Sequence, residues 1–580
     1  MHMPIRQYIK KIKFFSNGWV AGAFVTSLLV ALPLLVIFPE VFVAGDETWR
    51  HILHRLIPSY VMNTLLLMAG VAFLTFLMGV STAWLVTMYD FPGRRFFQWA
   101  LILPISIPAY ILGFTWAGIL EYTSPVYVFL RNNFGLETGP YLLFNILSLP
   151  GAIIILSLSL YPYVYLITRA YFLKQSTTLL DVAASLGRRP MNVFLSAALP
   201  LARPAIVAGI SLALMEVLND YGLARYFGVD TFTTGIFTAW FAFGNASAAM
   251  KLSAYLMVFV LALILLERYQ RGQMRYEVVG SHYRPPRIHR LRGLPLAAAL
   301  GICLLPLMLG FILPAAMLVH WSLQTASQVL DIRFWELIRN SFLLAVAAAA
   351  VVVVASLFIA FTVRSFPGRL VRVLARTATL GYALPGAVVA IGIMIPFLWL
   401  DGKFSAAMPG LGIALSGTWF ALIYAYMVRF MAVGYNSMDS GMAGLSPSLD
   451  EASRSLGHSN LSTLRKVILP LMKAPVLSAT LLVFIDVLKE LPLTLILRPF
   501  NFDTLAIRAF EYASDERVAE AAPAALIIVM VGIVPAFLLN RMISGEKVSR
   551  AEAAVSPTGA EVSFAGAANE RNERHNKERI

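Results

Sequence analysis

The chain has 580 residues, of which 59% are hydrophobic and only 13% are charged, and its mean hydropathy is +0.74. This composition excludes a soluble globular protein, which needs more charge than this to keep its surface hydrated. The formal charge of +15 is assigned to basic loops on the cytoplasmic side of a membrane rather than to nucleic-acid binding. We therefore expect an all-α, polytopic membrane protein without a nucleic-acid partner.

Long apolar runs follow one another along the chain, each close to the about 20 residues that cross a bilayer. Twelve spans are predicted, beginning near residues 18, 59, 98, 146, 203, 248, 294, 339, 376, 413, 475 and 521. The first run lacks a small-residue cleavage site, so it is interpreted as a span and not as a signal peptide. Arg6 and Lys10 precede it and predict a cytoplasmic N-terminus, and an even number of spans returns the C-terminus to the same side.

The chain contains an internal repeat. The sequence FPGR occurs at Phe91–Arg94 and again at Phe366–Arg369, 275 residues later, and Gly187 and Gly457 are 270 residues apart. Six spans separate the members of each pair, which predicts two halves in the same orientation. The predicted divisions are residues 1–270 for the first membrane-spanning half, 271–293 for a basic cytoplasmic linker, 294–541 for the second half and 542–580 for a disordered cytoplasmic tail.

A polar segment interrupts the apolar sequence at equivalent places in the two halves, Leu179–Pro200 and Leu449–Pro470. In the second copy, Ser448 and Glu451 fit a capping box that would open a helix. Gly457 can adopt the left-handed conformation that would end this helix. A short helix that ends at a glycine is therefore predicted.

A second short helix is predicted after this glycine, capped by Asn460 and stopped by Pro470. The first copy follows the same plan, with Gly187 at the break and Pro190 at the start of the second helix. The spacing from glycine to the following Leu-Pro is the same in both copies, which helix capping alone does not explain. We predict that each segment forms a rigid cytoplasmic projection that docks another protein.

These segments resemble the EAA loop of ATP-binding-cassette importer permeases. The matching residues are Glu451, Ala452, Gly457, Leu469 and Pro470 in the second copy, and Asp181, Ala183, Gly187, Leu199 and Pro200 in the weaker first copy. The resemblance implies that both loops couple to a homodimeric ATPase and that this chain is a fused, two-half permease. It also implies a periplasmic substrate-binding protein as a partner and a location in the bacterial inner membrane.

Other sequence signals bear on the energy source. The chain contains no GxxxxGK[ST] phosphate loop, so ATP hydrolysis is expected in a separate subunit. No Cys and His residues occur at metal-ligand spacing, and no cofactor or stably bound metal is expected. Cys303, the one cysteine, is interpreted as a small core residue.

The alternative to an ATP-binding-cassette permease is a secondary transporter of the major-facilitator kind. That class also has twelve spans in two parallel halves, but it does not require the glycine-hinged loops.

Four acidic residues lie inside predicted spans, where a charge is costly and usually functional. Glu216 and Asp486 occupy equivalent places in the two halves, and so do Asp220 and Glu490. Because each half spaces its acids at i,i+4, both are expected on one helix face. Together with Tyr221 they would suit a hard cation, which prefers oxygen ligands. The alternative is structural pairing of Glu216 and Asp486 with a neighbouring helix.

The sequences that contain these acids, NDYGLARYFGVDTFTTGIF and LKELPLTLILRPFNFDTLAIRAF, resemble the corresponding segments of ferric iron permeases. This resemblance implies ferric iron as the substrate. Permeases for thiamine, polyamine or phosphonate remain alternatives of the same class.

Overall fold

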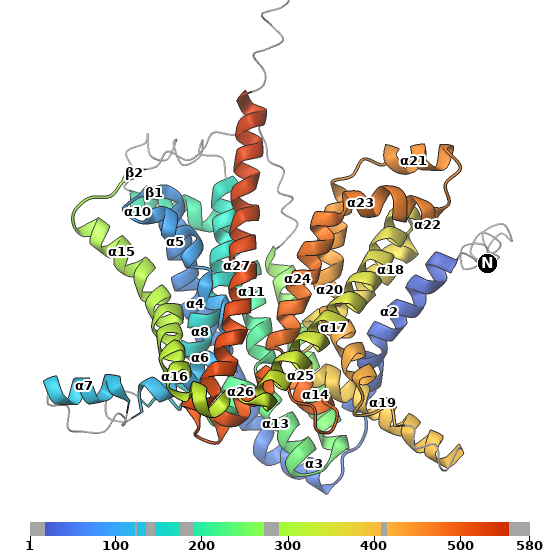
Figure 1. The fold of residues 1–580 in the computed structure, drawn as a ribbon, viewed down its shortest axis with the longest axis horizontal. Coiled ribbons are helices and arrows are strands. Elements are labelled where there is room, and N and C mark those ends of the chain that lie inside the picture. The colour runs from blue at the N-terminus through green and yellow to red at the C-terminus, as the bar shows by residue number, and fades with distance from the viewer. Residues whose placement is uncertain are drawn as a thin grey trace, which may run out of the picture.

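The computed structural model describes residues 18–121, 124–134, 145–174, 190–271, 289–407 and 414–555. Within these ranges the chain is almost entirely helical (Figure 1), as predicted from its apolar runs. The two strands are two residues long: β1 (Tyr89–Asp90) pairs in parallel with β2 (His289–Arg290).

The helices of the first half are, in chain order, α2 (Gly18–Ile37), η1 (Phe38–Val41), α3 (Glu47–His51), η2 (Ile52–Leu56), α4 (Ile57–Met88), α5 (Arg94–Ala100), η3 (Leu103–Ser106), α6 (Ala109–Ile119), α7 (Pro125–Phe134), α8 (Leu149–Lys174), α10 (Pro190–Val193), η5 (Phe194–Ala198), α11 (Leu199–Asn219), α12 (Gly222–Tyr226), α13 (Phe232–Phe237), η6 (Thr238–Ala242) and α14 (Ala246–Arg271). Those of the second half are α15 (Leu294–Leu307), η7 (Met308–Ile312), α16 (Leu313–Val329), α17 (Ile332–Ser365), α18 (Arg369–Ala378), η8 (Leu380–Ala383), α19 (Gly386–Ala407), α20 (Trp419–Ala443), α21 (Ser448–Ser455), α22 (Asn460–Thr463), η9 (Leu464–Ile468), α23 (Leu469–Leu471), α24 (Lys473–Lys489), α25 (Pro492–Leu497), α26 (Leu505–Ser514) and α27 (Val518–Val555).

Side-chain caps fix several of these helix starts. Asp331 precedes α17 and accepts a hydrogen bond from the Phe334 amide at 2.9 Å, which satisfies a donor that the helix leaves free. Thr231 and Thr504 cap α13 and α26 in the same way. The two threonines stand at equivalent places in the repeat, so the halves share local signals as well as spans.

Nine helices in the described ranges are long and apolar enough to cross a membrane, or eleven if each of two bent pairs counts as one span. The one predicted span outside this count is the one near residue 413, which is α20; its 25 residues carry Arg429 and several tyrosines and are therefore less apolar. It packs between α17 and α24, as α8 packs between α4 and α11. The helix α27 continues to Val555, past residue 542, where the tail was predicted to begin.

The span predicted to begin near residue 98 is present, but it is not one straight helix. The chain forms η3 and then α6, and the two parts are bent by 92°. Pro104 and Pro108 lie at this bend, and proline lacks the amide hydrogen that a continuous helix requires. The span predicted near residue 376 is also divided, into the amphipathic helix α18, the short turn η8 and the apolar helix α19.

The two halves exchange their first helices. The helix α2, from the first half, packs against α17, α18 and α19 of the second half, while α15 and α16 lie against α4 and α6 of the first (Figure 1). Polar contacts fix this exchange: Ser27 donates to the Leu374 carbonyl at 2.9 Å, and the Trp116 indole donates to the Leu309 carbonyl at 2.9 Å. Each half therefore completes the packing of the other.

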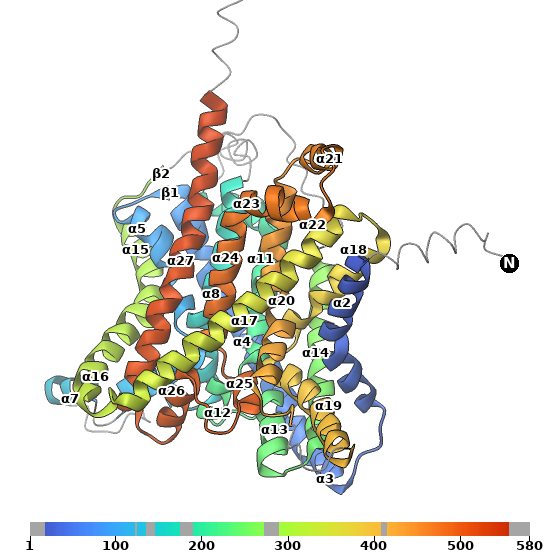
Figure 2. The same ribbon diagram turned by 45° about the vertical axis from the view of Figure 1, so that its right-hand side comes forward.

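The helices run between two distinct ends of the molecule. One end carries α21, α22, α23 and the strand pair, and the other carries α3, α13 and α26 (Figures 1 and 2). These are called the α21 end and the α3 end below. Toward the α21 end the outer helices spread apart on either side of α11, α24 and α27, which lie in the middle of the view (Figure 1).

Candidate functional site

A cavity of about 300 Å³ lies between the two halves, at the ends of α11 and α24. Segments of η3, α6, α8, α20 and α27 complete its wall. All five residues that the sequence proposed for a substrate path line this one cavity: Glu216, Asp220, Tyr221, Asp486 and Glu490. Residues 270 positions apart in the sequence thus meet in space because the parallel halves face each other.

The second acid of each pair lies beyond the end of its helix. Asp220 follows α11 with φ −68° and ψ 123°, and Glu490 follows α24 with nearly the same angles. Asp220 accepts a hydrogen bond from the Ala224 amide at 3.0 Å, and Glu490 accepts one from the Leu493 amide at 3.3 Å. The prediction that both acids share one helix face is therefore wrong, because the chain leaves the helix and uses the second carboxylate to cap the next one.

The four carboxylates differ in their partners. Asp486 forms an ion pair with Lys489 at 2.8 Å, and Glu490 forms one with Arg429 at 3.3 Å. The second pair is deeply buried, since each of its side chains is only 7% exposed. Glu216 makes no hydrogen bond or ion pair with any described residue, although it lines the cavity. With four acids against two bases, the cavity wall has a formal charge of −2.

The two cavity bases were not identified from the sequence. In the repeat, Lys489 corresponds to Asn219 and Arg429 to Ser159, so neither has a charged counterpart. Ser159 and Arg429 nevertheless perform one common task, donating to the equivalent carbonyls of Ile107 at 3.0 Å and Leu384 at 2.6 Å. A charge within an apolar helix was the available signal for both bases.

Asn219 links the halves directly, because its side-chain oxygen accepts a hydrogen bond from the Gly386 amide at 2.8 Å. Gly386 has no room for a side chain: a Cβ there would lie 2.6 Å from Oε1 of Glu490. The close approach of α19 to this carboxylate therefore favours glycine at that position, since a Cβ there would force the Glu490 side chain to shift.

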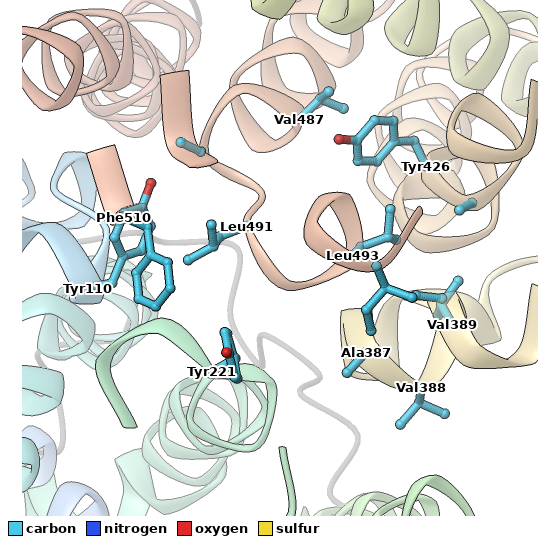
Figure 3. Close-up of a cluster of buried hydrophobic side chains, with 14 of the residues drawn as sticks. Tyr110, Tyr221, Ala387, Val388, Val389, Tyr426, Val487, Leu491, Leu493 and Phe510 are labelled. Atoms are coloured by element: carbon cyan, nitrogen blue, oxygen red, sulfur yellow. The ribbon is translucent and has the colours of Figure 1, made fainter. Parts of the chain in front are cut away.

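An aromatic cluster separates this central cavity from a second one. The cluster consists of Tyr110, Tyr221, Phe237 and Phe510 and includes a stacked pair, Tyr221 and Phe237, whose centroids are 3.6 Å apart. Phe510 lies 5.8 Å from Tyr221 and 6.3 Å from Tyr110, measured between centroids (Figure 3). Tyr221 lines both cavities, so the cluster forms the partition between them.

The second cavity, of about 450 Å³, lies on the α26 side of this partition. Charged residues of both signs line it, including Arg508, Glu511 and Arg517. Glu520 accepts a hydrogen bond from Arg517 and raises the pKa of that guanidinium, so Arg517 stays positively charged.

The second polar loop forms the predicted pair of short helices, α21 and α22. Gly457 lies between them with φ +78°, in the left-handed conformation that was predicted for it. Glu451 and Ala452 are exposed, and the side chain of Leu456 at the tip is 78% exposed. The hydroxyls of Ser453 and Thr463, 2.8 Å apart, tie the two helices together. The loop is thus a defined projection with an exposed outer face.

The predicted caps of this loop are wrong in detail. The residue before α21 is Pro447, and Ser448 makes no capping hydrogen bond to the helix. Ser459 caps α22 in place of Asn460, accepting from the Ser462 amide. The chain also continues past Pro470 through α23, and only then bends by 80° into α24.

The first polar loop is described only in part. Asp181, Ala183 and Gly187 lie outside the described residues. Leu199 and Pro200 lie in the first turn of α11, which runs on from η5 as one span, Phe194–Asn219. The two halves therefore differ here, because only the second has a sharp bend between its loop and the following span.

Two fused helical halves, a shared central cavity and a polar projection at one end define a membrane transport permease. A family described as "Binding-protein-dependent transport system inner membrane component" matches residues 76–275 and 353–546, one copy in each half. The chain belongs to this family. Its members are components of transport systems in the inner membrane, which sets aside the major-facilitator alternative.

Two relatives are similar over most of their length. The chain is 28% identical over 526 residues to the Fe(3+)-transport system permease protein FbpB 2 of Haemophilus influenzae, a match that covers 89% of this chain and 97% of that protein. It is 24% identical over 581 residues to the Ferric transport system permease protein FbpB of Actinobacillus pleuropneumoniae, covering 92% and 76% respectively. Both relatives are, like this chain, long enough to contain two halves.

Proposed function

We propose that this chain is the permease subunit of an ATP-binding-cassette importer that moves ferric iron across the bacterial inner membrane. The observation that carries the proposal is the central cavity, which is lined by four carboxylates, two from each half. Ferric iron is a hard cation that prefers oxygen ligands, and the cavity wall is formally negative. The names of the two relatives, both ferric permeases, support the same substrate.

The acids of the cavity would guide the ion rather than hold it. Among the described residues, no three His, Cys, Asp or Glu side chains are grouped closely enough to hold a metal ion. A transport path requires such weak binding, since an ion must be attracted enough to enter and bound weakly enough to leave. Glu216 is the acid best placed for the task, because it lines the cavity and forms no ion pair or hydrogen bond with a described residue.

The proposed topology places both termini and the α21 end in the cytoplasm. A homodimeric ATPase would then bind the two polar loops, with the exposed Glu451, Ala452 and Leu456 on the contact face of the second one. A periplasmic binding protein would deliver its cargo at the α3 end. The aromatic cluster closes the central cavity toward that end, and ATP-driven motion of the loops would open it.

The test is the substitution Glu216→Gln in cells that depend on this importer for iron. The amide keeps the size of the side chain and removes its charge. We expect normal membrane levels and thermal stability, because Glu216 has no ion-pair partner to lose among the described residues, together with at least tenfold slower uptake of ferric iron. The matched control is Glu336→Gln, which neutralises an exposed acid on α17.

Normal iron uptake by the Glu216→Gln variant would remove this residue from the transport path. Competition distinguishes the alternative substrates of the same class. An excess of thiamine, polyamine or phosphonate should leave iron uptake by the wild-type complex unchanged. Inhibition by one of them would replace ferric iron with that compound as the substrate.

A further inference from the structure

The guanidinium of Arg364 joins three helices at the α21 end. Arg364 lies in the last turn of α17 and donates to Oδ2 of Asp450, in the first turn of α21, at 2.7 Å. It also donates to three carbonyls at the end of α20: those of Met442 at 2.7 Å, Leu445 at 3.2 Å and Ser446 at 3.0 Å. One planar cation thus closes the end of α20 and holds the start of α21.

Both members of this ion pair are shielded from solvent, with the Arg364 side chain 12% exposed and that of Asp450 15% exposed. Oδ1 of Asp450 is buried and has no hydrogen-bond partner among the described residues, so Arg364 is the group that holds this carboxylate. Charge-assisted hydrogen bonds from a rigid guanidinium fix orientation as well as distance. The helix α21 is therefore attached firmly to α17.

The first half has neither member of the pair. With the offset of the FPGR motifs, Tyr89 stands where the second half has Arg364. With the offset of the loop glycines, Leu180 stands where the second half has Asp450. Helix capping common to both loops does not account for a contact whose two residues have no counterparts at the equivalent positions of the first half.

The N-terminal third of α17 contacts the segment that bears the aromatic cluster. Ser341 of α17 accepts a hydrogen bond from the Leu505 amide, at the start of α26, at 2.8 Å. Phe510 of α26 then contacts Tyr110 and Tyr221. From Ser341 to Arg364 the helix rises about 35 Å at 1.5 Å per residue. A single helix therefore spans the distance from α21 to the closure of the central cavity.

We propose that Arg364 is the positioning residue through which movement of α21 is transmitted along α17 to α26 and the aromatic cluster. The proposal rests on the proposed function, since it takes α21 as the docking helix of the ATPase. It adds a specific attachment, the Arg364–Asp450 pair, whose two residues the first half does not have at the equivalent positions. The second loop then acts on the aromatic cluster through α17, which is held by hydrogen bonds at Arg364 and at Ser341.

The experiment uses the complete complex of permease, ATPase and binding protein in liposomes, and measures substrate uptake per ATP hydrolysed. Arg364→Ala should lower this ratio at least tenfold while ATP hydrolysis continues. Asp450→Asn, which removes the charge but keeps the shape, should lower it less. The matched control is Arg339→Ala, an exposed arginine on the same helix, which should leave the ratio unchanged.

A second readout separates transmission from mere stabilisation. Spin labels at Phe241→Cys and Ser514→Cys report the width of the second cavity, and the native Cys303 is buried. In the parent protein the distance should change when the ATPase binds a non-hydrolysable ATP analogue. In Arg364→Ala, or in Asp450→Asn if the former does not assemble, this change should be lost although the ATPase remains bound.

A wild-type distance change and a wild-type uptake ratio in the assembled variant would overturn the proposal. Failure of the proposed function has a different signature, since the ATPase would then bind equally well to a permease in which Glu451 is replaced by lysine. If Glu451→Lys prevents ATPase binding while Arg364→Ala transports normally, α21 is the docking helix and Arg364 is not its transmitter.

Discussion

Substitution of Gly457 is the most specific test of whether the second polar loop, formed by α21 and α22, couples ATP hydrolysis to transport. Its φ of +78° lies in the left-handed region, and a Cβ added there would meet no atom within 4 Å. A substitution therefore acts through the backbone alone. For Gly457→Ala the left-handed conformation costs about 1–2 kcal/mol, which corresponds to about a 5–30-fold smaller population of correctly hinged loops.

Gly457→Pro is more severe for two structural reasons. Proline fixes φ near −65°, which is incompatible with the observed angle, and it removes the amide that donates to the Arg454 carbonyl at 2.9 Å. We expect Gly457→Ala to lower uptake per ATP by no more than about 30-fold and Gly457→Pro to lower it further. The spans should remain folded, because this residue is exposed and lies outside them.

The assay measures ATP hydrolysis and uptake in parallel in reconstituted complexes, with membrane levels determined for each variant. Gly444→Ala is the matched control, since this residue has a right-handed φ of −77° and lies just before the same loop. It adds the same methyl group without strain. Wild-type uptake per ATP by Gly457→Pro, at a wild-type membrane level, would refute the assignment of this loop to coupling.

Three further outcomes are expected. Arg429→Met should destabilise the permease by about 3–5 kcal/mol in denaturant unfolding, because it leaves Glu490 buried and unpaired; an unchanged midpoint would contradict the role of this pair. Gly386→Ala should also lower the midpoint, since its methyl group would lie 2.6 Å from Oε1 of Glu490, whereas an unchanged midpoint would mean that the carboxylate moves aside. The purified chain should hydrolyse no ATP, because its sequence has no phosphate loop; activity that persists after every co-purified ATPase is removed would contradict this.

The spans and the repeat were predictable because each depends on local sequence. An apolar run of sufficient length has few alternatives to a membrane helix, and the repeated glycines and FPGR motifs mark equivalent points. The bend between η3 and α6 was not predicted, since hydropathy reports the length of an apolar run and not its direction. Pro104 and Pro108 were the signal that could have indicated it.

The errors at the polar loop have a different origin. Ser448 and Glu451 carry the pattern of a capping box, but Asp450 of the same turn is bound by an arginine 86 residues away. A cap predicted from four neighbouring residues competes with tertiary contacts that the local sequence does not contain. The exchange of α2 with α15 and α16 between halves was missed for the same reason, because apolar runs do not specify which helix they pack against.

The cavity shows how a repeated scaffold supports unequal chemistry. Ser159 and Arg429 donate to equivalent carbonyls, so the arginine replaces the serine without changing the surrounding backbone contact. Its longer side chain also reaches Glu490, which ties that acid to the scaffold, whereas the counterpart of Glu490 has no such base. Glu216 is left unpaired among the described residues while its counterpart Asp486 is paired with Lys489. The first half thus contributes a carboxylate without an ion-pair partner, Glu216, whereas both acids of the second half are held in ion pairs. Neutralising Glu216 should therefore affect transport, and breaking the Glu490 pair should affect folding.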